Sequence, residues 1–87
     1  MTTVRIRISA TIDNEYENRC PEGMPENIGE GLNDLTIEEA RWVLSDAEYN
    51  CDPKAQTVGP YDMPLPVFNA YKALAKQARA AIAKVAA

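Results

Sequence analysis

The clearest repeat of apolar positions lies in the middle of the chain, where such residues recur at steps of three and four: Ile37, Ala40, Leu44, Ala47 and Cys51. This spacing predicts an α-helix with these residues on its buried face. Thr36 and Glu39 have the spacing of a capping box, which satisfies backbone N–H groups at a helix start. Asp52 precedes a proline and is therefore disfavoured in the helical region. The two signals predict a helix over 36–51.

Two aromatic residues of this helix, Trp42 and Tyr49, lie outside that apolar stripe. They are seven residues apart and have Glu38 and Asp46 among their neighbours. One interpretation is that the segment before the helix, or the N-terminal strand, folds over both rings and makes them part of the core. The other is an exposed aromatic pair in an acidic frame, which is typical of protein-binding sites. The pattern leaves both interpretations open.

The N-terminal residues alternate between apolar and polar from Val4 to Ile12. This period of two predicts a β-strand with one buried face. A strand needs a partner for its backbone hydrogen bonds, and no other segment alternates as clearly. Three candidates follow: a short hairpin arm over 14–20, the weak run 56–58, or the same strand of a second chain in a homodimer.

Two connecting stretches, 21–34 and 52–65, are rich in glycine and proline, which predicts turns. In the first stretch and just after it, Ile28, Leu32 and Leu35 keep a helical spacing. One or two helical turns are therefore an alternative to an irregular loop.

Pro66 predicts the start of a second helix, because its missing N–H costs nothing at the first helical position. The residues that follow are rich in alanine, the best helix former, so we expect the helix to reach about Val85. Its apolar stripe consists of Val67, Tyr71, Leu74, Ala78, Ala81, Ile82 and Val85. The predicted fold class is α+β, with an N-terminal strand or short hairpin, an irregular Pro/Gly-rich segment, and two main helices packed antiparallel.

Length and composition limit the architecture to one small domain spanning 1–87. The chain has 87 residues, of which 46% are hydrophobic and 25% charged, as expected for a soluble globular protein. It has neither an apolar run long enough to cross a membrane nor the pattern of a signal peptide. These features predict a cytoplasmic protein without membrane contact, in which Cys20 and Cys51 stay reduced.

The charges are unevenly distributed. Residues 13–62 contain all thirteen carboxylates and carry a net charge of −10, whereas residues 63–87 carry +4. Attraction between acidic and basic parts of one fold explains this asymmetry. A surface with both signs of charge also steers a partner.

Catalytic and metal-binding patterns are missing from the sequence. It has no histidine, its two cysteines are too far apart for a C-x-x-C pair, and it lacks a phosphate-binding glycine loop. Asp13, Glu15 and Glu17 alternate as in a calcium loop, but Asn18 stands where that loop requires glycine. We therefore predict no catalytic, cofactor or metal site, and no enzyme activity.

The N-terminal strand, with Arg5, Arg7, Ser9 and Thr11 on one face, resembles the β-ribbon of ribbon-helix-helix repressors. The resemblance implies a dimeric DNA-binding regulator in which Arg5 and Arg7 contact the major groove. It covers about nine residues, and an acidic Pro/Gly-rich segment follows where that family begins a helix. The isoelectric point near 4.7 also opposes binding to nucleic acid.

The chain resembles small accessory proteins encoded by bacteriophages in its size and general sequence character. The segments 35–44 and 62–71 carry this resemblance. This resemblance implies a non-enzymatic binder or inhibitor of a host protein. The sequence thus favours a protein–protein interaction module whose partner has a basic surface. Its predicted partner-binding residues are Trp42, Tyr49, Glu38 and Asp46. The DNA-binding regulator with Arg5 and Arg7 is the alternative.

Overall fold

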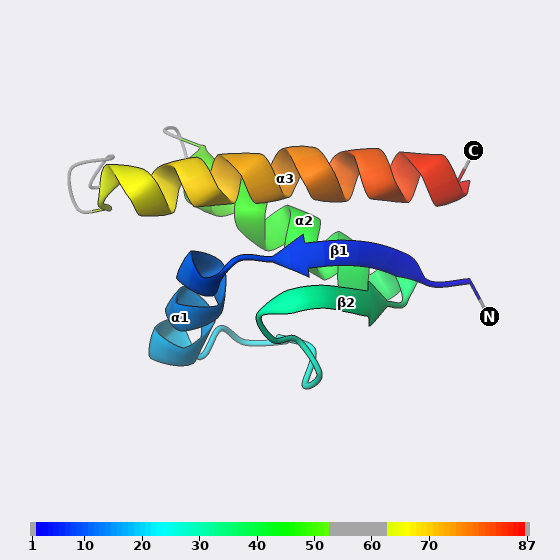
Figure 1. Ribbon diagram of the computed structural model, residues 1–87, viewed down its shortest axis with the longest axis horizontal. Helices are drawn as coiled ribbons and strands as arrows, with labels where there is room; N and C mark the ends of the chain where they lie inside the picture. Colours follow the sequence, from blue (N-terminus) through cyan, green and yellow to red (C-terminus); the bar gives the residue numbers. More distant parts are fainter. Residues whose placement is uncertain (1, 53–62, 87) are drawn as a thin grey trace.

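The computed structural model describes residues 2–52 and 63–86, and Figure 1 shows how their helices and strands are arranged. The elements follow in the order β1 (Val4–Ile8), α1 (Ala10–Arg19), β2 (Gly31–Leu35), α2 (Ile37–Cys51) and α3 (Leu65–Ala86). Within the described residues, three helices accompany one two-stranded sheet, so the predicted α+β class is confirmed. None of the described helices is long and apolar enough to span a membrane.

The first strand is shorter than predicted. β1 ends at Ile8, because the Ser9 hydroxyl accepts a hydrogen bond from the Ile12 backbone N–H at 3.3 Å and caps α1. Ile12 remains buried, but on the inner face of a helix rather than on a strand. The predicted hairpin arm over 14–20 is wrong for the same reason, since α1 occupies residues up to Arg19.

The partner of β1 is β2, which pairs with it antiparallel from Val4 opposite Leu35 to Ile8 opposite Gly31. The predicted helical turns through Leu32 and Leu35 are therefore wrong. The Asn33 side chain accepts from the Gly29 N–H at 3.1 Å and donates to the Gly29 carbonyl at 2.8 Å. These local bonds give the backbone an alternative to a helical turn. The weak run 56–58 lies outside the described residues.

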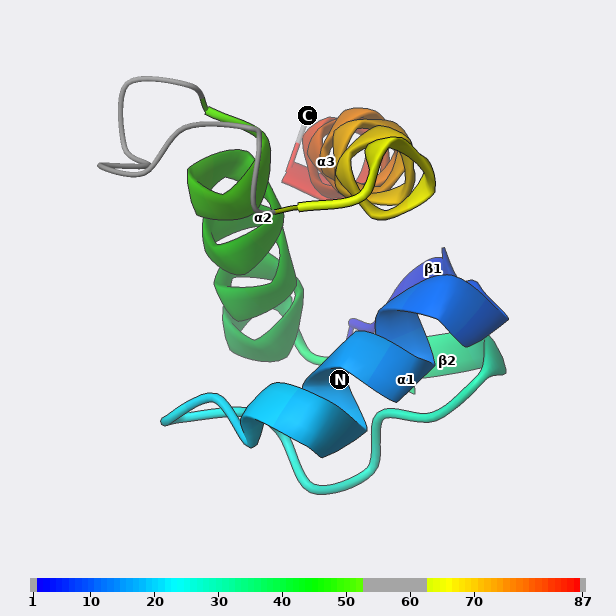
Figure 2. The same cartoon turned by 90° about the vertical axis from the view of Figure 1, so that its left-hand side faces the viewer.

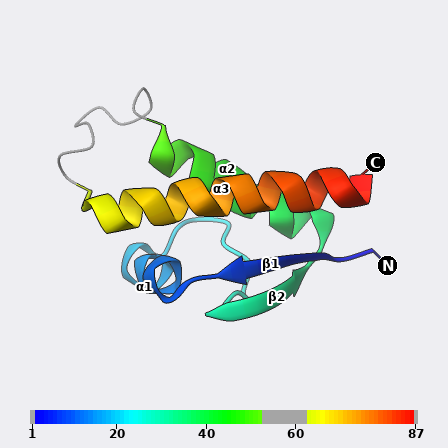
Figure 3. The same ribbon diagram turned by 45° about the horizontal axis from the view of Figure 1, so that its top comes forward.

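Two helices cover the apolar face of the sheet. Figures 1 and 3 show α3 running lengthwise along β1, and Figure 2 shows α2 crossing at an angle beside α3. The two helices pack against each other as expected, while their antiparallel arrangement stays a prediction. The fully buried side chains of largest volume are Tyr16, Tyr71, Ile6, Ile8, Ile12, Leu35, Val4 and Val43.

The buried face of α2 differs from the predicted stripe. Ala40 and Ala47 are buried as expected, but Val43 and Asn50 are buried as well. The other predicted members, Ile37, Leu44 and Cys51, are only partly buried. The buried face of α2 is displaced because the helix packs against α3 and also against the sheet, and these two neighbours cover different sides of it. On α3 the prediction is closer, since Tyr71, Leu74 and Ala78 of its stripe are all buried.

Candidate functional site

The capping box of α2 fixes the start of the helix that carries the candidate site. The Glu39 backbone N–H donates to the Thr36 hydroxyl at 3.1 Å, and the Thr36 N–H donates to the Glu39 carboxylate at 2.8 Å. The predicted cap is therefore confirmed. It fixes the starting point of the helix that carries Trp42 and Tyr49.

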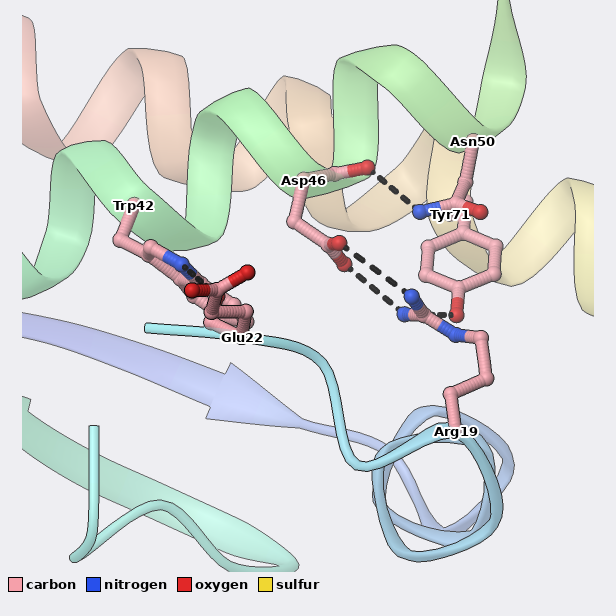
Figure 4. A network of polar contacts seen from close by, with 6 residues as sticks. All are labelled: Arg19, Glu22, Trp42, Asp46, Asn50 and Tyr71. Atoms are coloured by element: carbon pink, nitrogen blue, oxygen red, sulfur yellow. Dashed lines mark hydrogen bonds and ion pairs between the residues drawn. The ribbon is translucent and has the colours of Figure 1, made fainter. Parts of the chain in front are cut away.

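Trp42 is partly covered by the segment before the helix. Its ring meets the ring of Tyr16 edge to face, with centroids 5.7 Å apart. Its indole N–H donates to the Glu22 carbonyl at 3.3 Å (Figure 4). The backbone at Gly23 approaches so closely that a Cβ there would lie 3.2 Å from the indole nitrogen. The covered interpretation thus describes Trp42, which is half-buried and packs against the core.

Tyr49 fits the opposite interpretation. It lies two helical turns further along α2, and 63% of its surface is exposed. The two interpretations of the aromatic pair therefore apply to one residue each. Trp42 belongs partly to the fold, and Tyr49 belongs to the surface.

An open groove of about 620 Å³ brings these residues together. Its lining consists of Pro21, Glu22, Trp42, Ser45, Asp46 and Tyr49. Three of the four predicted partner-binding residues are among them. The fourth, Glu38, is exposed one turn before Trp42 and does not line the groove. The sequence did not indicate Pro21 or Glu22, because tertiary contacts bring them to α2, and it gave no signal for Ser45.

Asp46 is anchored by an ion pair with Arg19. Both oxygens accept from the guanidinium, at 3.0 and 3.5 Å, and Figure 4 shows this contact beside α1. The Asp46 side chain is only 13% exposed, so the pair is better shielded from water than the other ion pairs of the described residues. Asn50 donates to the Asp46 carbonyl at 2.7 Å and completes the local network. Asp46 thereby becomes a fixed part of the groove wall.

Arg19 is itself held between two aromatic rings. Its guanidinium carbon lies 5.7 Å from the centre of the Tyr16 ring and 5.6 Å from that of Tyr71. The Arg19 Nη2 group donates a hydrogen bond to the Tyr71 hydroxyl at 2.7 Å. Burial raises the pKa of Tyr71 to about 12, and burial also raises the pKa of Tyr16. The Tyr16 hydroxyl is buried and has no hydrogen-bond partner among the described residues. No spacing signal links Arg19 to Asp46, which explains why sequence patterns missed this cluster.

Arg5 and Arg7 project from the outer face of the sheet. Arg5 forms a 3.0 Å ion pair with Asp34 on β2, and both side chains are largely exposed. The backbone of Arg7 bonds to the Gln77 side chain, which accepts at 2.6 Å and donates at 3.0 Å. One edge of β1 thus pairs with β2, and the other edge is hydrogen-bonded at Arg7 by the Gln77 side chain of α3. A role of Arg5 and Arg7 in binding DNA stays a prediction.

The described residues contain no cluster of three or more cysteine, aspartate or glutamate side chains arranged to hold a metal ion. Comparisons with known protein families, curated proteins and solved structures found no match.

Proposed function

We propose that this chain is a non-enzymatic protein-interaction module that binds its partner through the groove beside Trp42 and Tyr49. In this proposal it acts in the cytoplasm as a phage-type binder or inhibitor of a host protein. The observation that carries the proposal is Tyr49, a large aromatic side chain that is 63% exposed at the edge of the groove.

Aromatic side chains are suited to this role because they bury a large area with few rotatable bonds. Energetic hot spots of protein interfaces are enriched in Trp and Tyr. Here the rigid helix α2 carries both, and a partner would bury the free side of Trp42 together with Tyr49. This arrangement supports a small interface with one aromatic centre.

The acidic residues define the kind of partner. Glu22 lines the groove, and Glu38 lies exposed one turn before Trp42. Asp46 already pairs with Arg19, so its main contribution is to hold the groove wall in place. Exposed carboxylates accelerate encounter with a basic surface and disfavour acidic competitors. We therefore expect a partner with basic residues around an apolar spot, and an association rate that falls as salt is added.

Tyr49→Ala is the variant that tests the proposal. The wild type, Tyr49→Ala and Leu65→Ala are each used to capture partners from a bacterial lysate. Leu65→Ala is the matched control, because Leu65 is 68% exposed on α3. The captured partner should be lost with Tyr49→Ala and kept with Leu65→Ala, while all three proteins unfold at similar temperatures. Equal capture by the wild type and Tyr49→Ala would refute the groove as the binding site.

A further inference from the structure

Trp42 and Tyr49 both line the groove, and the space between their rings is its slot. Trp42 and Tyr49 are seven residues apart on α2, which corresponds to about 10 Å along the helix axis at 1.5 Å per residue. Ser45 lies between them, is exposed, and lines the same groove. Because serine is small, the space above it is left open for one side chain of another molecule.

The charges of the slot favour a cation. Glu22 and Asp46 are the acidic members of its lining, and none of the six lining residues is basic. Arg19 already pairs with Asp46, so Glu22 supplies the carboxylate that can receive a cation. Glu22 makes no ion pair within the part of the chain that the structure describes. A positively charged side chain that enters the slot therefore meets an available carboxylate beside two aromatic rings, and ring faces attract cations.

The protein already holds one arginine in this manner. Arg19 is seated by the rings of Tyr16 and Tyr71, at 5.7 and 5.6 Å, together with the carboxylate of Asp46. In the view of Figure 4, Asp46 stands between this seat and the contact of Trp42 with Glu22. The groove offers the same combination of two rings and a carboxylate, but with no occupant from the described chain.

We infer that the groove binds an arginine side chain of the partner, with the guanidinium beside Trp42 and Tyr49 and bonded to the Glu22 carboxylate. This inference rests on the proposed function and names the group that the groove recognises. Arginine fits better than lysine because its planar guanidinium stacks on rings and bonds a carboxylate through two N–H groups. The aliphatic stem of that arginine would pack on Pro21, which lines the groove.

A displayed library of random peptides tests the inference. Peptides are selected on the wild-type chain and rescreened on Ser45→Leu, which fills the slot, and on Ala80→Leu, which adds the same side chain at an exposed position of α3. Selected peptides should contain arginine, should bind Ser45→Leu at least tenfold more weakly, and should bind Ala80→Leu as they bind the wild type. Trp42 is the only tryptophan, so its fluorescence reports occupancy of the groove directly.

Substitutions in a selected peptide and in Glu22 then identify the group recognised. Replacing the peptide arginine by norleucine should weaken binding about tenfold, and replacing it by lysine should weaken binding less. Glu22→Gln should weaken the arginine peptide several-fold and leave the norleucine peptide unchanged. If Ser45→Leu fails to fold, as judged by circular dichroism, Glu22→Gln and Tyr49→Ala serve as the rescreening variants.

The outcomes separate this inference from the proposed function. Peptides that depend on the groove but carry no essential arginine would overturn the inference and leave the proposed function standing. A selection that yields no peptide sensitive to the groove variants would overturn both.

Discussion

At the scale of single residues, Trp42 serves both the fold and the groove. Trp42→Ala removes the contact with Tyr16 and the hydrogen bond to Glu22, and we expect it to lower the free energy of unfolding by about 3 kcal/mol. Trp42→Phe keeps a ring against Tyr16 and loses only the hydrogen bond, so it should cost about 1 kcal/mol. Urea unfolding followed by circular dichroism measures both. A Trp42→Ala protein as stable as the wild type would contradict this packing.

Two glycines in the same connecting segment predict opposite results. Gly23 has a φ of +80°, and a Cβ there would lie 3.2 Å from the Trp42 indole nitrogen, so Gly23→Ala should destabilise the fold by about 1–2 kcal/mol. Gly29 has no atom within 4 Å of the corresponding position. Gly29→Ala should therefore be neutral or stabilise by up to about 0.5 kcal/mol. The two midpoints of urea unfolding are measured side by side, and equal midpoints would contradict the conformation and packing described at Gly23.

The buried tyrosines predict a loss of stability in alkali. Burial raises the pKa of Tyr71 from 10.0 to about 12, and burial raises that of Tyr16 as well. Between pH 10 and 12 the unfolded chain has released these protons and the folded chain still holds them, so stability falls as the pH rises through this window. Urea midpoints from pH 8 to 11.5 measure the fall. Tyr71→Phe should reduce its slope, and an unchanged slope would show that Tyr71 is not a source of the effect.

At the scale of elements, the capping box of α2 is the most local of the structural signals. Thr36→Ala removes the hydroxyl that accepts from the Glu39 N–H and should cost about 1 kcal/mol of unfolding free energy. Thr3→Ala, at an exposed position before β1, provides the control and should be close to neutral. Chemical denaturation of the three proteins gives the comparison. If Thr36→Ala and Thr3→Ala cost the same, the cap contributes nothing to stability.

Elements with signals inside their own sequence were predictable, and elements defined by distant contacts were not. The cap and span of α2 follow from neighbouring residues, and so does most of the apolar stripe of α3. β2 has only weak alternation, because Gly31 and Asn33 occupy the inward positions beside Leu35. Its assignment depends on pairing with β1, which lies far away in sequence.

The candidate site was predictable to a similar degree. Helical spacing placed Trp42, Asp46 and Tyr49 near one another, and the groove contains all three. Spacing gave no indication that Trp42 and Tyr49 differ in exposure, because that difference arises from the segment around Glu22 that folds over only one ring. The ion pair of Asp46 with Arg19 could not be predicted from the sequence either, because it joins α1 to α2 across 27 residues.

At the scale of the whole molecule, the Gln77 side chain protects the outer edge of β1. Gln77→Ala would leave the Arg7 backbone N–H and carbonyl without the bonds they make to α3. Unprotected strand edges pair with other chains. We therefore expect the variant to self-associate at concentrations where the wild type is monomeric, as measured by light scattering. A wild type that already dimerises through its N-terminal strand would instead support the homodimer that the sequence left open for residues 4–12.

The position of α3 in the chain also affects how the protein is made. α3 contributes Tyr71, Leu74, Ala75 and Ala78 to the core, and its Gln77 meets a residue 70 positions earlier. During synthesis, the apolar face of β1 therefore leaves the ribosome long before the helix that covers it. Until α3 is made, water and other nascent chains can reach part of this apolar face, which consists of Val4, Ile6 and Ile8. The core around β1 is complete only once α3 has been made, so the chain is more exposed to aggregation before that point.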